Sequence, residues 1–135
     1  MVDANVAAKW FLVEEHADIA EDVFRSSYIL TAPDLLVSEL GSIFREKVLR
    51  RELTLDRAAQ ALSITLGRVE LVRSEEAFTE ALAIAISSRA SFYDSLYVAH
   101  AVNLGLRFVT ADSRLPAALA GRFDSTLWAL REFQA

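Results

Sequence analysis

The chain contains 135 residues, of which 53% are hydrophobic, and it carries a formal net charge of −5 at pH 7. This size and composition suit one domain with a packed core over residues 1–135, and no apolar run reaches the roughly 20 residues of a membrane span. The absence of cysteine excludes disulfides, thiolate metal ligands and a cysteine nucleophile. Net negative charge, taken alone, disfavours a nucleic-acid-binding protein. We expect a cytoplasmic protein, because the N-terminus also lacks the pattern of a signal peptide.

Strand and helix patterns alternate along the chain. The first half predicts, in order, the end of a strand at 1–3, a helix from 5, an amphipathic helix over 16–26, a buried strand over 28–33, and helices over 35–51 and 55–66. The second half predicts a strand at 69–72, a helix over 74–87, a helix from 91 to 105, a strand over 106–110, a short helix over 112–119 and a last strand over 125–130. Strands separated by helices indicate an α/β fold with a parallel sheet covered on both faces.

Residues that favour helix ends support these bounds. Asp34, Thr54 and Ser74 are predicted N-caps, and Gly67 and Gly105 are predicted to end their helices. The helices over 35–51 and 55–66 are separated by a short loop, so they are predicted to form a hairpin.

Four carboxylates stand apart from the other acidic residues, most of which fit solvated helix faces. Asp3 and Asp112 follow predicted strands at their carboxyl ends, where open α/β folds form their clefts. Glu39 and Asp94 fall on the apolar faces of two helices, near their N-terminal turns. Four carboxylates at one sheet end would repel one another, and a divalent cation is the ordinary compensation.

Each acid also has a structural interpretation. An aspartate after a strand is often a helix cap, and an acid on an apolar stripe can pair with arginine. The combination favours a metal site over four separate structural roles. With only two histidines in the chain, such a site would rest on carboxylate oxygen, which selects hard ions such as Mg²⁺ or Mn²⁺.

Four segments around these acids resemble one known family. They are DANVAAKWF near Asp3, VSELGSIFRE around Glu39, FYDSLYVAHA around Asp94 and FVTADSRL around Asp112. In order and spacing they resemble the PIN domain, particularly the VapC-type toxin ribonucleases of prokaryotic toxin–antitoxin systems. The resemblance covers the whole chain and implies a three-layer α/β fold. That fold has a central parallel sheet of about five short strands, flanking helices, and a protruding helical hairpin over about 35–67.

The resemblance also implies an activity, namely metal-dependent endoribonuclease cleavage of RNA. The four acids would be the catalytic, metal-binding residues for one or two Mg²⁺ or Mn²⁺ ions, with Thr110 and Asn5 as supporting polar residues. The bound ions would offset much of the negative charge that disfavours RNA binding. Near the mouth of the pocket, the predicted RNA contacts are Arg45, Arg50, Arg51 and Arg114. The expected partners are RNA, a cognate VapB-type antitoxin bound at the helical hairpin, and a second copy of the chain in a homodimer.

Other functions remain open at this stage. A PIN nuclease of RNA processing or decay would share these residues, as would a catalytically weak PIN-like binding module. A haloacid-dehalogenase-type phosphatase would need a second aspartate two residues after Asp3, where Asn5 stands. A receiver-like domain would need a phosphoacceptor aspartate ending a middle strand, and neither YILTAP nor VELV supplies one.

Overall fold

Short parallel strands form the centre of the fold in a computed structural model that describes residues 1–135. Strand β1 (Leu30–Pro33) pairs with β2 (Val69–Val72), and β3 (Phe108–Thr110) pairs with β4 (Leu127–Ala129). Both pairs are parallel, so the two strands of each pair end at the same edge of the sheet. The strands are only three or four residues long, and the α/β class predicted from the sequence is confirmed.

The two strand pairs are joined by the first residues of the chain. The N–H of Val2 donates to the carbonyl of Thr31 in β1 at 3.0 Å. On its other side Val2 pairs in parallel with Val109 of β3, whose N–H donates to the Met1 carbonyl at 2.9 Å. The resulting order is β2, β1, Val2, β3, β4. The predicted strand at 1–3 is therefore present as a single bridging residue in the middle of the sheet.

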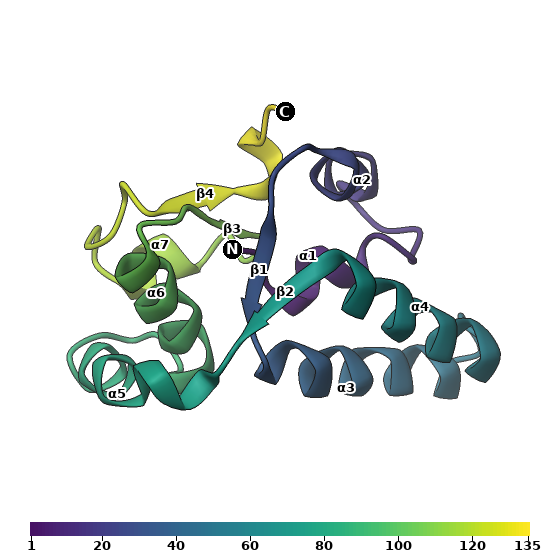
Figure 1. Cartoon of the computed structure of the whole chain (residues 1–135), viewed down its shortest axis with the longest axis horizontal. Helices are drawn as coiled ribbons and strands as arrows, with labels where there is room; N and C mark the ends of the chain where they lie inside the picture. The colour runs from purple at the N-terminus through teal and green to yellow at the C-terminus, as the bar shows by residue number, and fades with distance from the viewer.

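Helices cover the strands on both sides (Figure 1). They are α1 (Ala4–Ala8), α2 (Ala17–Arg25), α3 (Leu35–Leu49), α4 (Leu55–Arg68), α5 (Phe78–Ile86), α6 (Phe92–Leu104) and α7 (Leu115–Ala118), with 3₁₀ turns η1 (Ser74–Ala77) and η2 (Leu130–Glu132). In the view of Figure 1, β1 and β2 run between α5, α6 and α7 on the left and α1 to α4 on the right. No helix combines the length and hydrophobicity that crossing a bilayer requires.

The predicted hairpin is formed by α3 and α4, which extend together from the body of the molecule (Figure 1). Helix α3 buries Leu36, Leu40 and Phe44, which recur every four residues on one face. Thr54 caps α4 as predicted, by accepting a hydrogen bond from the Arg57 N–H at 3.2 Å.

The predicted stop at Gly67 is wrong, because α4 continues through Arg68. The Arg68 guanidinium donates to the carbonyls of Phe24, Ser26 and Tyr28 at 2.7 to 3.1 Å. These bonds tie the end of α4 to the segment before β1. Because these bonds satisfy three backbone carbonyls, they favour a helix that continues to Arg68 over one that ends at Gly67.

Asp34 occupies the predicted N-cap position of α3 but forms no side-chain cap, and the predicted cap at Ser74 is wrong. Asp34 has helical backbone angles, and its carboxylate accepts bonds from the N–H and hydroxyl of Ser74 rather than from its own helix. Ser74 lies inside η1, and its carbonyl faces the His100 ring nitrogen at 3.3 Å. The hydrogen bonds between Ser74 and Asp34 thus link the end of β1 to the segment after β2.

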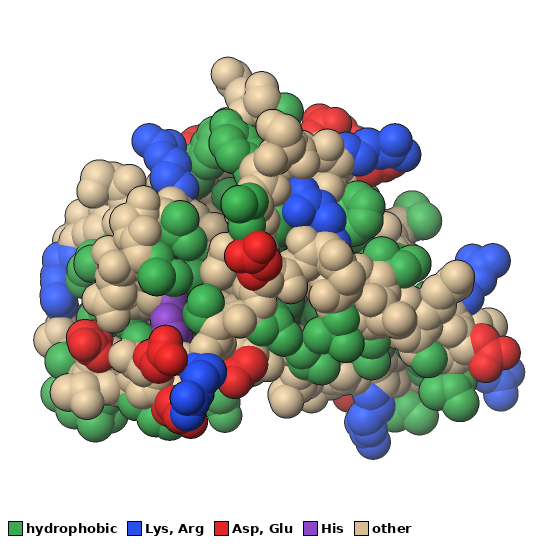
Figure 2. Space-filling model, in the orientation of Figure 1, with side chains coloured by type: hydrophobic (Ala, Val, Ile, Leu, Met, Phe, Trp, Pro, Cys, Tyr) green, Lys and Arg blue, Asp and Glu red, His purple; other side chains and the backbone are tan.

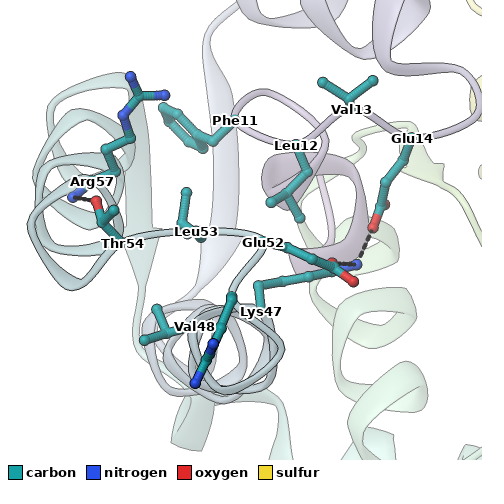
Figure 3. Close-up of a pocket in the computed structure, with 11 residues that line it drawn as sticks. Phe11, Leu12, Val13, Glu14, Lys47, Val48, Glu52, Leu53, Thr54 and Arg57 are labelled. Carbon is teal, nitrogen blue, oxygen red and sulfur yellow. Dashed lines mark hydrogen bonds and ion pairs between the residues drawn. The ribbon is translucent and has the colours of Figure 1, made fainter.

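A lysine fastens the hairpin to the loop that follows α1. The Lys47 ammonium lies 2.9 Å from both Glu14 and Glu52, and Figure 3 shows it between them. These residues line a cavity of about 820 Å³, whose apolar wall includes Leu12 and Leu53. The hairpin is therefore held at both its ends, at this lysine and at Arg68.

Replacing Phe44 with alanine is expected to lower the free energy of unfolding by about 3–5 kcal/mol, because its buried ring fills the space between α3 and Phe11. Leu49→Ala is the matched control, since Leu49 ends the same helix with 64% of its surface exposed. Urea unfolding followed by circular dichroism measures both. Equal losses in the two variants would contradict this account of the core.

Candidate active site

Asp3 occupies a buried position directly after the bridging residue of the sheet. It is the N-cap of α1, and its Oδ1 accepts a hydrogen bond from the Val6 N–H at 2.8 Å. Its Oδ2 accepts from the Thr110 hydroxyl at the end of β3, at 2.7 Å. Only 8% of Asp3 is exposed. Both oxygens are thus fixed, one by its own helix and one by a neighbouring strand.

Glu39 faces the same region from the second turn of α3. The hydroxyl of Tyr97 on α6 donates to its Oε1 at 2.8 Å. Tyr97 is 1% exposed, and its ring stacks on Phe108 of β3 with centroids 5.3 Å apart. Burial raises the pKa of Tyr97, so the phenol stays a hydrogen-bond donor. This contact, between residues 58 positions apart, was not predicted from the sequence; the signal for it was the position of Tyr97 three residues after Asp94.

Asp94 lies in the first turn of α6 and is half-buried. The Ser91 hydroxyl accepts from the Asp94 N–H at 3.0 Å and donates to its carboxylate at 2.8 Å. The aromatic residues just before it, Phe92 and Tyr93, are 36% and 61% exposed. Asp94 therefore stands at the edge of the apolar face rather than within it, while Tyr97 and Val98 pack behind it.

Asp112 is connected to this group through Thr110. Its N–H donates to the Thr110 Oγ1 at 3.1 Å, and that hydroxyl in turn donates to Asp3. The Asp112 carboxylate accepts from the backbone and guanidinium N–H groups of Arg114 at 2.9 to 3.3 Å. These hydrogen bonds from Arg114 hold the pKa of Asp112 below its usual value.

Asp3 and Glu39 both lie where the ionised form of a carboxylate is disfavoured. Burial, the largest cause, raises the pKa of Asp3 to about 6, against the opposing bonds from Val6 and Thr110; the charge of Asp94 adds to the rise. Burial also raises the pKa of Glu39, with the charges of Asp3 and Asp94 acting in the same direction. Such a group of oxygen donors suits a hard divalent cation, which would relieve both the burial and the repulsion.

The carboxylates nonetheless do not form a ready-made metal cluster. No three Asp, Glu or His side chains approach closely enough to hold one ion together. Each acid is hydrogen-bonded to a different partner: Asp3 to Thr110, Glu39 to Tyr97, Asp94 to Ser91 and Asp112 to Arg114. An ion bound between them would have to compete with these hydrogen bonds.

Asn5 and the predicted arginines occupy different surroundings. Asn5 is exposed on α1, makes no hydrogen bond with its side chain, and lines a groove beside Glu39. Arg50 and Arg51 lie at the far end of the hairpin, and Arg50 stands roughly 16 Å along the helix from Glu39 at 1.5 Å per residue. Arg45 lies on α3 between Glu39 and Arg50, and its guanidinium pairs with Glu46. The RNA contacts predicted at these three arginines stay a prediction, whereas Arg114 bonds directly to one of the four carboxylates, Asp112.

Two further cations line a groove beside Thr110. They are Lys9 and Arg131, and Ala111 lines the same groove. On the face shown in Figure 2, the Lys and Arg side chains are scattered and form no continuous basic surface.

Comparisons with known proteins place this geometry in context. The PIN domain family model matches residues 1–119. Two curated proteins, each named Ribonuclease VapC1 and from the CDC 1551 and H37Rv strains of Mycobacterium tuberculosis, are 33% identical to the chain over 90 residues. That match covers 67% of this chain and 68% of each relative.

Asp3→Asn is expected to stabilise the metal-free protein at pH 7. A pKa raised from 3.8 to about 6 means that ionising Asp3 costs the fold up to about 3 kcal/mol. Between pH 3.8 and about 6 the folded state binds more protons than the unfolded state. The stability contributed by protonated Asp3 is therefore fully present below about pH 4 and is lost as pH rises through about 6. Urea unfolding in EDTA should show a gain for Asp3→Asn at pH 7 that shrinks toward pH 4. A gain independent of pH would contradict the assignment.

Proposed function

Because this chain belongs to the PIN domain family, we propose that it is a metal-dependent endoribonuclease that hydrolyses RNA phosphodiester bonds, the toxin of a VapBC-type pair. The observation that carries the proposal is the position of Asp3, which directly follows the bridging residue of the sheet, is held by Thr110 at the end of β3, and lies beside the carboxylates of Glu39 and Asp94. The name of the relatives, Ribonuclease VapC1, supports RNA as the substrate.

The four carboxylates Asp3, Glu39, Asp94 and Asp112 are the proposed ligands for one or two Mg²⁺ or Mn²⁺ ions. When bound, such ions lower the pKa of water and stabilise negative charge on the scissile phosphate and leaving oxygen. The raised pKa values of Asp3 and Glu39 support this assignment, because a nearby cation would favour the ionised forms that burial disfavours.

The surrounding residues have positioning roles in this proposal. Thr110 fixes Asp3 from β3, and Tyr97 fixes Glu39 from α6, so ligands on different elements keep set orientations. Arg114 has its guanidinium on the Asp112 carboxylate. If Asp112 turned toward an ion, this guanidinium would be freed to pair with an RNA phosphate.

The proposed antitoxin partner would bind the hairpin of α3 and α4. Exposed apolar side chains support this position, with Leu49 and Leu55 at its tip exposed by 64% and 73%. Ile64 and Leu66 on α4 are exposed by 41% and 51%. An amphipathic helix from a partner could cover such side chains.

The proposed homodimer would use α5, whose Phe78, Leu82 and Ile86 recur every four residues and are 46%, 52% and 77% exposed. A two-fold axis near Leu82 would place Phe78 of one copy opposite Ile86 of the other, so the apolar stripe is complementary to itself.

Purified protein is expected to cleave structured RNA in Mg²⁺ or Mn²⁺ and to lose activity in EDTA, as followed on denaturing gels. Asp94→Asn should reduce the cleavage rate by about 100-fold or more, since it removes a proposed ligand. Asp22→Asn, the same change at an exposed acid on α2, is the control and should remain active. Cleavage that persists in EDTA, or that Asp94→Asn leaves unchanged, would refute the proposed mechanism.

Leu82→Arg is expected to convert a dimer to a monomer, because it places a charge at the centre of the α5 stripe. Light scattering after size-exclusion chromatography gives the mass of each species. Leu104→Arg is the control, since Leu104 is similarly exposed (49%) at the far end of α6. A Leu82→Arg protein with the mass of the wild-type dimer would exclude this interface.

A further inference from the structure

An open groove of about 420 Å³ lies directly beside Glu39. One wall is a single face of α3, formed by residues that recur at helical spacing: Leu35, Ser38, Glu39, Ser42 and Ile43. The opposite side is formed by Asn5 from α1 and Tyr93 from α6. The groove therefore begins at the carboxylates and continues along the hairpin.

The chemistry of this groove differs from that of a phosphate site. No lysine or arginine lines it, and Glu39 gives it negative charge. Backbone phosphates would be repelled here, whereas the groove beside Thr110 offers Lys9 and Arg131. The polar side chains that are present, Asn5, Ser38 and Ser42, are neutral and can both donate and accept hydrogen bonds. Neutral donors and acceptors of this kind match the edge of a nucleobase.

Tyr93 supplies a flat surface for such a base. Its side chain is 61% exposed, and its hydroxyl makes no hydrogen bond within the chain. The ring stands edge-on to Phe92 with centroids 6.5 Å apart, and Phe92 in turn contacts Phe78 of α5 at 5.9 Å. This row of rings restrains Tyr93 while leaving it open to solvent. An exposed and restrained aromatic ring beside a groove is well suited to stack on an unpaired base.

We propose that this groove binds a nucleobase of single-stranded RNA next to the scissile phosphate, with Tyr93 stacking on the base and Asn5, Ser38 and Ser42 contacting its edge. The inference rests on the proposed nuclease function and adds the residues that would hold a base beside the reacting phosphate. A base in a duplex is stacked on both faces and could not reach the ring. Phosphates on either side of the base would pass over the carboxylates and toward Lys9 and Arg131.

The test measures binding in an Asp94→Asn background, so that cleavage does not interfere. Fluorescence anisotropy reports the affinity for three labelled probes: a single-stranded 12-nucleotide RNA, the same sequence as a duplex, and a 12-unit abasic ribose-phosphate chain. Tyr93→Ala should weaken binding of the single strand about tenfold, and Tyr93→Phe should retain most of it, because stacking needs the ring and not the hydroxyl. Binding of the abasic chain should be the same for all three proteins.

Tyr28→Ala is the matched control, since Tyr28 is also exposed (52%) but lines a cavity elsewhere, with Val23 and Phe133. It should bind all three probes as the Asp94→Asn parent does. In the otherwise wild-type protein, Tyr93→Ala should raise KM for single-stranded RNA and leave kcat within about twofold, as expected for a contact made equally in ground and transition states.

The outcomes separate this proposal from the nuclease function. Equal affinity of parent and Tyr93→Ala for the single strand would overturn the base subsite, while metal-dependent cleavage by the wild-type protein would still support the nuclease. An equal loss of affinity for the abasic chain would also overturn it, because the ring would then act on the backbone. Wild-type protein that binds the single strand with the Tyr93 dependence described, but never cleaves it, would refute the nuclease and retain the subsite.

Discussion

The hydrogen bond from Thr110 to Asp3 is the contact on which the candidate site depends. It joins the end of β3 to the start of α1, and so fixes a buried carboxylate between two elements that are 107 residues apart in sequence. The same hydroxyl accepts the Asp112 N–H, which places the loop after β3 around it. Without this donor, Asp3 would lose one of the bonds that oppose the cost of burying its charge. The other carboxylates are then arranged around a residue that cannot move freely.

The order of the elements and the placement of the acids could be predicted from the sequence. Periodic apolar residues identify α3 and α6, and short β-branched runs identify β1 and β3, because these signals are local. The predicted ends of helices were less accurate. Asp34 and Ser74 bond to each other across 40 residues, and Arg68 bonds to carbonyls more than 40 residues away. Such long-range partners compete with local caps, and a single sequence does not reveal them.

The same distinction applies to the site. Strand ends and helical faces predict where Asp3, Glu39, Asp94 and Asp112 lie in the fold. They do not predict the Tyr97 bond to Glu39, which spans 58 residues, because Tyr97 also reads as ordinary core packing. Arg50, one of the predicted RNA contacts, shares a helix with Glu39, and that helix places it roughly 16 Å along the axis from the carboxylate.

Val2 has two structural roles in the fold. One residue connects the β1 and β2 pair to the β3 and β4 pair, and the next residue is Asp3. The contacts that join the two strand pairs at Val2 therefore also position the Asp3 carboxylate. A chain whose sheet has opened at Val2 would lose both the link between β1 and β3 and the position of Asp3, so the same local opening would disrupt the sheet and the candidate site together.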